Sequence, residues 1–426
     1  MCFSIVKKIR FNWIYYFIST IIIFSYLLGF ILNENSGGGG QNDLEGHIWF
    51  VIESFKESFL FTINNYGIWT EAVWPLHHII HAFLNPFSYS QNTLKLSHFI
   101  YSFVAVVILF LCLLEKKKNI KNINDSFIIT LPFFLLLSPY FRTTAYWATT
   151  ENTSLIFLLL SIYFFLRLKK NETTINIFLV CLFSSLTLYA RQYYFFLNIL
   201  FLIWLLKKQL YKKLIYSIIF YLFFSIPGIY LIYTWGALYD VNSNPANYTN
   251  YISFQNFYVN FFCVTSVFFI YSIPFIVFKF KELFTFLRKY KFYFFIFGLI
   301  IMLLPYDYPW TEGKINLGGG LPIKLSVLFF DNYFFLKIIS LLGIIVFLYL
   351  SNLNINNFII LIFTIIIFCL PKIFFQEYLN PFLYILFIFL IDFKNNSFLY
   401  RKQFTITLLL YESFILISAI FYQHFF

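Results

Sequence analysis

Two carboxylates and an imidazole gather within five residues near the start of the chain. Asp43, Glu45 and His47 follow a glycine run at 37–40, which would let a substrate approach closely. A carboxylate in such a place can accept the proton of a substrate hydroxyl as a general base. On a helix, Asp43 and His47 share one face because they are four residues apart, whereas Glu45 points elsewhere. An alternative and compatible role for Asp43 is to cap the helix that follows.

A second set of side chains could bind an anion. Arg191 and Gln192 lie in a very short turn between two apolar runs. An arginine at membrane depth normally faces a partner or a polar cavity, and its guanidinium matches phosphate with two hydrogen bonds. Arg191 is therefore a candidate contact for a lipid phosphate, with Arg142 and Lys372 as weaker candidates. Snorkelling of Arg191 to the membrane surface is the alternative, and Glu377 could simply neutralise Lys372.

A third set lies at 71–81. His77 and His81 share a helical face and could hold zinc, with His78 between them. No acidic or cysteine ligand stands at a recognisable spacing, so we expect interfacial histidines and no metal. Glu71 and Trp74 combine a carboxylate with an aromatic ring, as the lining of a sugar site does. They are candidate substrate contacts.

The composition assigns the chain to a membrane. Of its 426 residues 61% are hydrophobic and 11% are charged, whereas a soluble protein averages ~25% charged residues. The net charge of +12 does not indicate nucleic acid, because the basic residues fall in short clusters between apolar runs. Such clusters are topology signals.

Short motifs exclude several classes of enzyme. The five cysteines are widely separated, so neither a CxxC zinc site nor a disulfide framework is predicted. The chain has no Walker A loop, GxSxG or HExxH motif, which disfavours nucleotide-driven work and serine or zinc proteolysis. We expect no cofactor and no metal.

The elements that must position these side chains are membrane helices. Since a spanning helix needs about 20 apolar residues, the sequence predicts an all-α polytopic membrane protein with about thirteen transmembrane helices in one integral membrane domain, 1–426. The expected spans are 11–32, 98–114, 127–138, 152–166, 175–190, 193–206, 214–235, 257–278, 292–305, 332–350, 358–370, 381–392 and 404–424.

The charges predict which side the loops face. With thirteen spans, 22 of the 30 lysines and arginines fall in the N-terminus and alternate loops, which places these inside and the N-terminus in the cytoplasm. Twelve of the 18 acidic residues lie in the other set of loops. Orientation does not require this, so we expect a function of carboxylates on the outer face.

Two outer loops are prominent. The first, 33–97, is the largest soluble piece and contains a helix-compatible stretch at 42–61, whose aromatic residues suit an interfacial amphipathic helix. We place the candidate active site in this loop. The late loop at 306–331, rich in glycine and proline, is expected to be irregular and to lie on the outer surface.

The order of these features resembles the GT-C membrane glycosyltransferases, and within them the dolichyl-phosphate-glucose α-1,2-glucosyltransferase family. That family opens its first loop with an Asp-Glu-x-x-His motif, which Asp43 and His47 match at the same spacing. Leu44 stands at the place of its second acid, and Glu45 is displaced by one residue. Arg191-Gln192 resembles the Arg-Gln motif of the family.

The later motifs are also similar in order. The segment 235–256 resembles a polar loop that precedes an aromatic helix, and 325–332 resembles a late outer segment ending in Asp-Asn, here Asp331-Asn332. The family's C-terminal Arg-Tyr is missing, and Glu377-Tyr378 occupies that place. Asp331, Asn332 and Glu377 are thus further candidate substrate contacts.

The resemblance implies an inverting, metal-independent transfer of a hexose from a polyprenyl- or dolichyl-phosphate sugar to a lipid-linked glycan on the outer or lumenal face. Asp43 would be the base, with Glu45 and His47 in support, and Arg191 would contact the phosphate. The bacterial inner membrane and the endoplasmic reticulum both fit, and membrane lipids, but no nucleic acid, are expected partners.

Two other functions remain open. A lipid-linked oligosaccharide flippase or another transporter would need ionisable groups along its helices, where this chain has few, such as Lys337 and Glu412. For both we expect buried hydrogen bonding. An O-antigen polymerase usually places its large outer loop late in the chain, whereas here the largest loop is the first.

Overall fold

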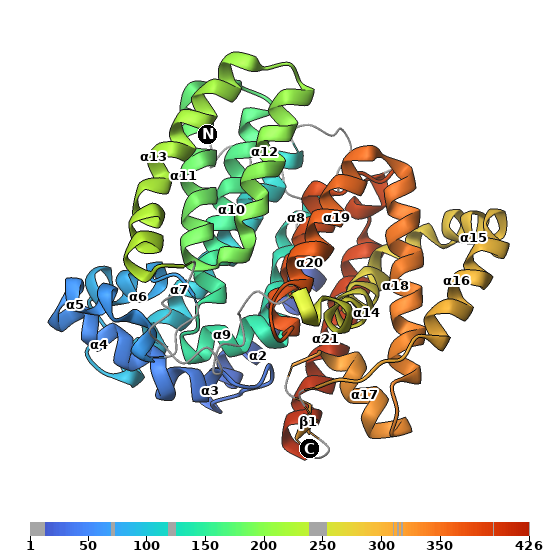
Figure 1. The fold of residues 1–426 in the computed structure, drawn as a ribbon, viewed down its shortest axis with the longest axis horizontal. Helices are drawn as coiled ribbons and strands as arrows, with labels where there is room; N and C mark the ends of the chain where they lie inside the picture. The colour runs from blue at the N-terminus through green and yellow to red at the C-terminus, as the bar shows by residue number, and fades with distance from the viewer. Residues whose placement is uncertain are drawn as a thin grey trace. The chain divides into compact units, whose positions relative to one another are not determined.

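The computed structural model describes residues 13–69, 73–117, 125–237, 254–309, 311–312, 315–316, 318–394 and 396–425. These residues are almost wholly helical (Figure 1), which confirms the prediction of an all-α protein. Within the described ranges, β-structure is limited to the antiparallel pair β1 (Thr311–Glu312) and β2 (Ile315–Asn316).

Seven of the described helices are long and apolar enough to cross a membrane. These are α2 (Trp13–Ile31), α7 (Gln91–Lys117), α10 (Glu151–Leu168), α13 (Tyr211–Trp235), α14 (Phe257–Ile276) continued by α15 (Phe280–Lys289), α18 (Phe334–Leu353) and α21 (Lys402–Phe425). Several expose large apolar side chains along their length, as lipid-facing helices do. The chain thus has the architecture of a polytopic membrane protein.

The remaining helices are shorter. A bent pair made of 128–137 and α9 (Pro139–Trp147) turns by 70°, as a broken span or a re-entrant loop does. Shorter apolar helices are α11 (Thr174–Ala190), α12 (Phe196–Lys207), α16 (Lys291–Leu303), α17 (Leu321–Phe330) and α19 (Ile355–Cys369). Every predicted span contains a helix, but the number that cross the membrane stays a prediction.

The expected span at 381–392 differs most from its prediction. Its helical part consists of α20 (Phe382–Ile385) and a π-helical turn at Leu386–Leu390, and every residue from Phe382 to Phe389 is buried. Nine helical residues rise only about 14 Å, less than half the hydrocarbon thickness of a bilayer. This segment is a buried helical insertion within its own unit.

The chain divides into two compact units, which are described separately. The first comprises Met1–Ala246 and Tyr400–Phe426, and the second Asn247–Leu399. The boundary at 246–247 falls in the polar segment 235–256, which was not predicted to be a boundary between units. In the first unit α10 packs between α7 and α11, α11 also packs on α13, and α21 packs on the first limb of the bent pair.

The first outer loop is helical, as predicted for 42–61. One continuous helical stretch runs from α3 (Gly40–Asp43) through a π-helical turn (Leu44–Ile48) into α4 (Trp49–Glu57), and α5 (Phe59–Asn64) follows. Ser58 separates α4 from α5, because its backbone is extended and its hydroxyl caps α5 by accepting from the Phe61 amide. Later in the loop lies α6 (Leu76–Ile79), which continues as a π-helical turn over Ile80–Leu84.

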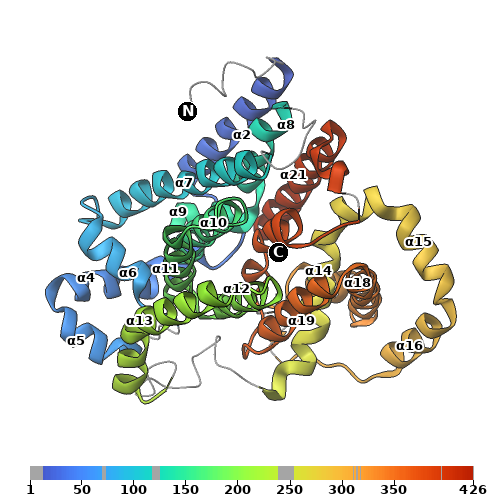
Figure 2. The ribbon, with the colours of Figure 1, turned by 90° about the horizontal axis from the view of Figure 1, so that it is seen from above.

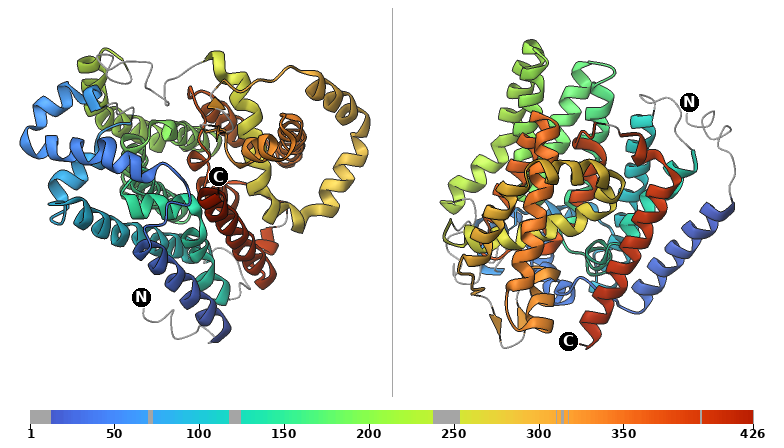
Figure 3. Two further views of the ribbon diagram at one scale, coloured as in Figure 1. Left: turned by 90° about the horizontal axis from the view of Figure 1, so that it is seen from below. Right: turned by 90° about the vertical axis from the view of Figure 1, so that its right-hand side faces the viewer.

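In the second unit α14 and α18 approach very closely. A Cβ on Gly343 would lie 1.9 Å from the Thr265 carbonyl oxygen, and the hydroxyls of Thr265 and Ser340 are 2.7 Å apart. Figures 2 and 3 show α15 and α16 as an outer limb beside this packed pair. Lys337 near the start of α18 donates to the carbonyls of Met302 and Leu304 at the end of α16, which confirms the hydrogen-bonding role expected of it.

The late outer loop is not irregular throughout, so that expectation is wrong. The loop contains β1, β2 and the ten-residue helix α17. Gly320 turns the chain with a φ of +81°, Pro322 stands in the first turn of α17, and the residues that follow are apolar. We had read Gly and Pro as loop signals, whereas here they mark the entry to a helix.

Candidate functional site

Asp43 and His47 face each other on one side of the first-loop helix. Their side chains are partly exposed, and His47 Nε2 lies 3.5 Å from Asp43 Oδ1. The helix begins at Gly40, three residues before Asp43, whose side chain makes no capping hydrogen bond. The capping alternative is therefore wrong. What remains is an accessible carboxylate beside an imidazole.

Glu45 points to a different neighbour, as its position on the helix predicted. Gln41 Nε2 donates to Glu45 Oε1 over 3.0 Å, and the Glu45 side chain is exposed. Gly46 has open space where a side chain would be. Asp43, Glu45 and Gly46 are thus all accessible at the surface of this helix.

The glycine run positions α3 against α9. Gly38 and Gly39 have φ values of +75° and +77°, which only glycine adopts without strain. A Cβ on Gly40 would lie 2.6 Å from Thr143 Cγ2, and the Gly37 amide donates to Thr143 Oγ1 over 2.7 Å. The run brings two backbones together and in this way orients the helix that carries Asp43.

Lys95 is a polar residue near this site that the sequence reasoning did not consider. Its ammonium donates to Asn33 Oδ1 over 2.7 Å and lies 3.7 Å above the ring of Trp147. Glu45 lies within electrostatic range of it. Its place near the start of the long apolar helix α7 was the available signal, since a lysine at the end of such a helix faces either the membrane surface or a polar site.

Arg142 is buried in an ion pair. Its Nη2 lies 2.5 Å from Glu34 Oε2 and also donates to the Ser25 carbonyl over 2.8 Å, and the residue is 2% exposed. Ser36 Oγ donates to the other carboxylate oxygen of Glu34 over 2.7 Å. These bonds occupy Arg142 inside the first unit, so its assignment as a phosphate contact does not fit this structure. The expected spans 127–138 and 152–166 leave Arg142 in the loop between them, whereas in the structure it lies in α9, the second limb of the bent pair.

Arg191 also pairs with a carboxylate, that of Glu151. Both side chains are about nine-tenths buried, and the two form a salt bridge. Glu151 stands in the first turn of α10, where the helix dipole favours a negative charge, and it accepts from Thr149 Oγ1 over 2.8 Å. A buried, paired guanidinium does not snorkel to the surface, which removes that alternative. Arg191 directly follows α11, and Gln192 begins the next short helix, in the tight turn that was expected.

Neither acidic partner was singled out from the sequence. Glu34 and Glu151 lie 108 and 40 positions from their arginines, Glu34 between α2 and α3 and Glu151 in the first turn of α10. Both belong to the acids assigned to the outer side, and this was the only signal that could have found them.

The proposed aromatic sugar contact is part of the core. Trp74 is 6% exposed, and its ring packs 5.1 Å from that of Tyr189 and against Gly228. A sugar-stacking aromatic ring needs an open face, so the assignment of Trp74 to substrate binding does not fit this structure. Glu71 lies outside the described residues.

His77, His78 and His81 are buried, so the expectation that they are interfacial is wrong. His77 and His78 are 0% exposed and His81 is 2% exposed. His78 Nδ1 lies 2.8 Å from the Tyr66 hydroxyl. His77 and His81 meet His98 of α7, which the sequence reasoning had not considered, and these three are a possible ligand set for a metal ion.

The remaining candidates lie in the second unit. Asp331 and Asn332 form the turn between α17 and α18: Asp331 has a φ of +50°, and Asn332 caps α18 by accepting from the Phe334 amide. Lys372 and Glu377 are half-buried in the segment before α20, with Glu377 in a short 3₁₀ helix. Asp331 and Asn332 thus shape a turn, and Lys372 and Glu377 lie in a partly buried segment. A substrate role for these four residues stays a prediction.

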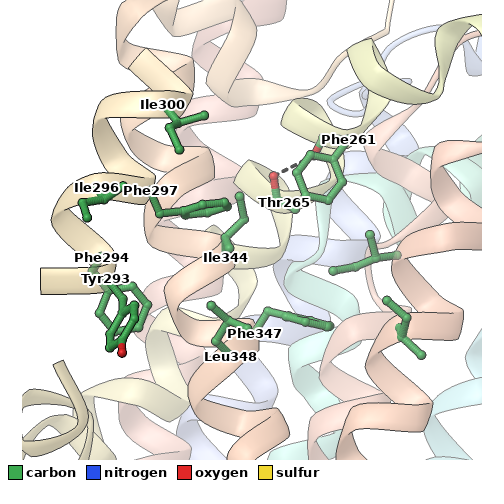
Figure 4. Close-up of a pocket in the computed structure, with 12 residues that line it drawn as sticks. Phe261, Thr265, Tyr293, Phe294, Ile296, Phe297, Ile300, Ile344, Phe347 and Leu348 are labelled. Carbon is green, nitrogen blue, oxygen red and sulfur yellow. Dashed lines mark hydrogen bonds between the residues drawn. The ribbon is translucent and has the colours of Figure 1, made fainter. Parts of the chain in front are cut away.

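The second unit also has an apolar pocket of about 500 Å³ (Figure 4). Phe297 and Ile300 of α16 face Ile344 and Phe347 of α18 across it, and its two hydroxyl-bearing residues are Thr265 of α14 and Tyr293 of α16. Such a lining suits a hydrocarbon chain. It contains no carboxylate and no imidazole.

Known proteins offer no independent assignment of these residues. Comparison with protein-family models, with curated proteins and with solved structures finds no match.

Proposed function

We propose that this chain is a membrane glycosyltransferase of the GT-C kind, which transfers a hexose from a polyprenyl-phosphate sugar to a lipid-linked glycan. The observation that carries the proposal is the Asp43–His47 pair, an accessible carboxylate 3.5 Å from an imidazole, directly after the first long apolar helix. A protein dominated by apolar helices has ready access to a lipid-linked substrate.

In this proposal Asp43 is the general base. Its carboxylate accepts the proton of the acceptor hydroxyl as that oxygen attacks the anomeric carbon of the donor. The bond from the anomeric carbon to the phosphate oxygen breaks, polyprenyl phosphate leaves, and the anomeric configuration is inverted. His47 orients the Asp43 carboxylate, which lies 3.5 Å from its Nε2. Glu45 supplies a second negative charge near the site. The reaction needs no cofactor.

The leaving phosphate needs a cation, and Arg191 is the proposed one. Glu151 forms a salt bridge with it in this structure. A phosphate that reaches Arg191 must therefore replace or share this carboxylate. A guanidinium that changes partners in this way gains its phosphate bonds as charge develops on the leaving oxygen.

The topology belongs to the proposal as well. Thirteen crossings with the N-terminus in the cytoplasm would put the first loop on the outer or lumenal face, in a bacterial inner membrane or the endoplasmic reticulum. The pocket between α16 and α18 would suit part of a polyprenyl chain or a membrane lipid.

A donor panel tests the proposal. Purified protein is incubated with a lipid-linked glycan extract and a set of polyprenyl-phosphate sugars, and free polyprenyl phosphate is measured. We expect release with one or a few of the sugars and transfer of that sugar to the acceptor lipid. A flippase would move lipid-linked glycan across a vesicle membrane and release no polyprenyl phosphate, which would overturn the proposal.

A further inference from the structure

Three histidines from two separate helical segments converge in the first unit. His77 lies in α6, His81 one turn later, and His98 near the start of α7, and all are at least 98% buried. Their ligand nitrogens lie within 4.8 Å of one another, and His81 Nε2 is 3.0 Å from His98 Nδ1. In a tetrahedral zinc site neighbouring nitrogen ligands are about 3.3 Å apart. Small rotations of the rings would bring all three to that spacing.

We infer that His77, His81 and His98 bind a divalent first-row transition metal ion, with zinc as the prototype. Three neutral imidazoles are a ligand set that zinc accepts, with a fourth position for water or another oxygen. The hydroxyl of Thr153 lies 2.8 Å from His77 Nδ1, so an ion bound at this nitrogen replaces that hydrogen bond. The inference is independent of the proposed transferase activity.

The hydrogen bonds of His77 are those of a metal ligand. Its Nε2 lies 2.9 Å from the carbonyl oxygen of Ala148. A carbonyl only accepts, so this nitrogen carries the proton and the lone pair is on Nδ1, which points to Thr153. A backbone carbonyl that fixes the tautomer of a histidine in this way is the usual support of a ligating imidazole.

Asn85 provides a sharp test because it controls the tautomer of His81. Asn85 Oδ1 accepts from the Phe87 amide, so its Nδ2 faces His81 Nδ1 at 3.0 Å as a donor. In this arrangement His81 Nε2 carries the proton and donates to His98. An ion bound at His81 Nε2 instead needs the proton on Nδ1 and an acceptor at Asn85. Asn85→Asp supplies that acceptor and still accepts from Phe87.

The experiment measures metal binding by the purified full-length protein, which carries no polyhistidine tag. After treatment with a chelator, each variant is titrated with Zn²⁺ and with Co²⁺, and bound metal is counted by elemental analysis and by Co²⁺ absorption. We expect about one ion per chain, ~10-fold tighter binding in Asn85→Asp, and more than 100-fold weaker binding in His98→Asn.

His78→Asn is the matched control, because His78 is equally buried and lies on the same helix but is not among the three ligands. Melting temperatures identify variants that do not fold. If the wild-type protein binds neither ion, or if Asn85→Asp and His98→Asn bind as His78→Asn does, the site does not exist.

Discussion

Arg142 and Arg191 show how the same residue type can serve two purposes. Both are buried and each faces one carboxylate, Glu34 or Glu151. Arg142 also bonds to the α2 backbone at Ser25, so it joins α9 to α2. Arg191 lies in a tight turn between two helices, where a change of partner requires less rearrangement. We therefore interpret Arg142 as a residue of the fold, while the role of Arg191 in phosphate binding stays a proposal.

Removing one partner of these pairs should destabilise the protein. Arg142→Met leaves the Glu34 carboxylate buried without its cation, which typically costs about 3–5 kcal/mol. We expect a lower melting temperature for Arg142→Met, and partial recovery in the double variant Arg142→Met/Glu34→Gln, because no buried charge then remains. If the double variant is no more stable than Arg142→Met, the ion pair does not determine how stably α9 is held in the fold.

Arg191 should respond differently in a donor assay. Glu151→Gln frees the guanidinium from its competitor, so we expect tighter binding of polyprenyl phosphate together with lower stability. Arg191→Ala should lose that binding, and Arg191→Lys should keep part of it. Equilibrium binding of the lipid phosphate and melting temperatures are measured on all three variants. Unchanged binding throughout would remove Arg191 from the site.

Helix packing depends on a few positions where side chains are absent. Gly343 of α18 lies against the backbone of α14, and Gly29 of α2 leaves space for Arg142 and Glu34, whose side chains a Cβ would meet at 2.3 and 2.5 Å. At both places a small residue lets two elements approach, as is usual for helices in membranes. Neither glycine was singled out from the sequence, because its neighbour is far away along the chain.

A pair of Gly→Ala variants tests this account of packing. At Gly343 the new Cβ would meet a carbonyl oxygen at 1.9 Å, and neither backbone can move without separating α14 from α18. We expect destabilisation by at least ~1–3 kcal/mol, the range that is typical of overpacking. Gly298→Ala is the control, because its Cβ would meet only the end of a leucine side chain at 3.2 Å, and alanine favours a helix. Equal melting temperatures for the two variants would contradict the close approach of α14 and α18.

Local patterns were predictable, and long-range pairings were not. The four-residue spacing of Asp43 and His47 was enough to place them together, since both lie in one continuous helical stretch. The Arg142–Glu34 pair depends on a 70° bend that follows Ser138, and the histidine cluster on the meeting of two elements. Such contacts arise from tertiary packing, which a single sequence does not display.

At the scale of the whole molecule, apolar composition predicted the class of protein. Seven long apolar helices confirm a polytopic membrane protein, while the number of crossings and the side of each loop rest on charge alone. The division into two units was not foreseen. Sidedness matters most, because the proposed chemistry requires the first loop to face away from the cytoplasm.

Labelling of introduced cysteines tests the sidedness. With a membrane-impermeant reagent on oriented vesicles, we expect Asn42→Cys and Lys117→Cys to react from opposite sides, because α7 crosses between them. Asn171→Cys should react from the same side as Lys117→Cys. The described native cysteines are buried, which keeps the background low. Reaction of Asn42→Cys and Lys117→Cys from one side would overturn the topology.

Turnover of the Asp43→Asn variant tests the central claim most directly. Once the panel has identified a donor, the rate of polyprenyl phosphate release is measured for the wild-type protein, for Asp43→Asn and for Glu53→Gln, an exposed control on the following helix. An amide is nearly the same size as a carboxylate but cannot accept the proton, so we expect a ~10²–10⁴-fold loss in Asp43→Asn with an unchanged melting temperature, and wild-type turnover in Glu53→Gln. If folded Asp43→Asn keeps most of the wild-type turnover, Asp43 is not the base and the account of the site is wrong.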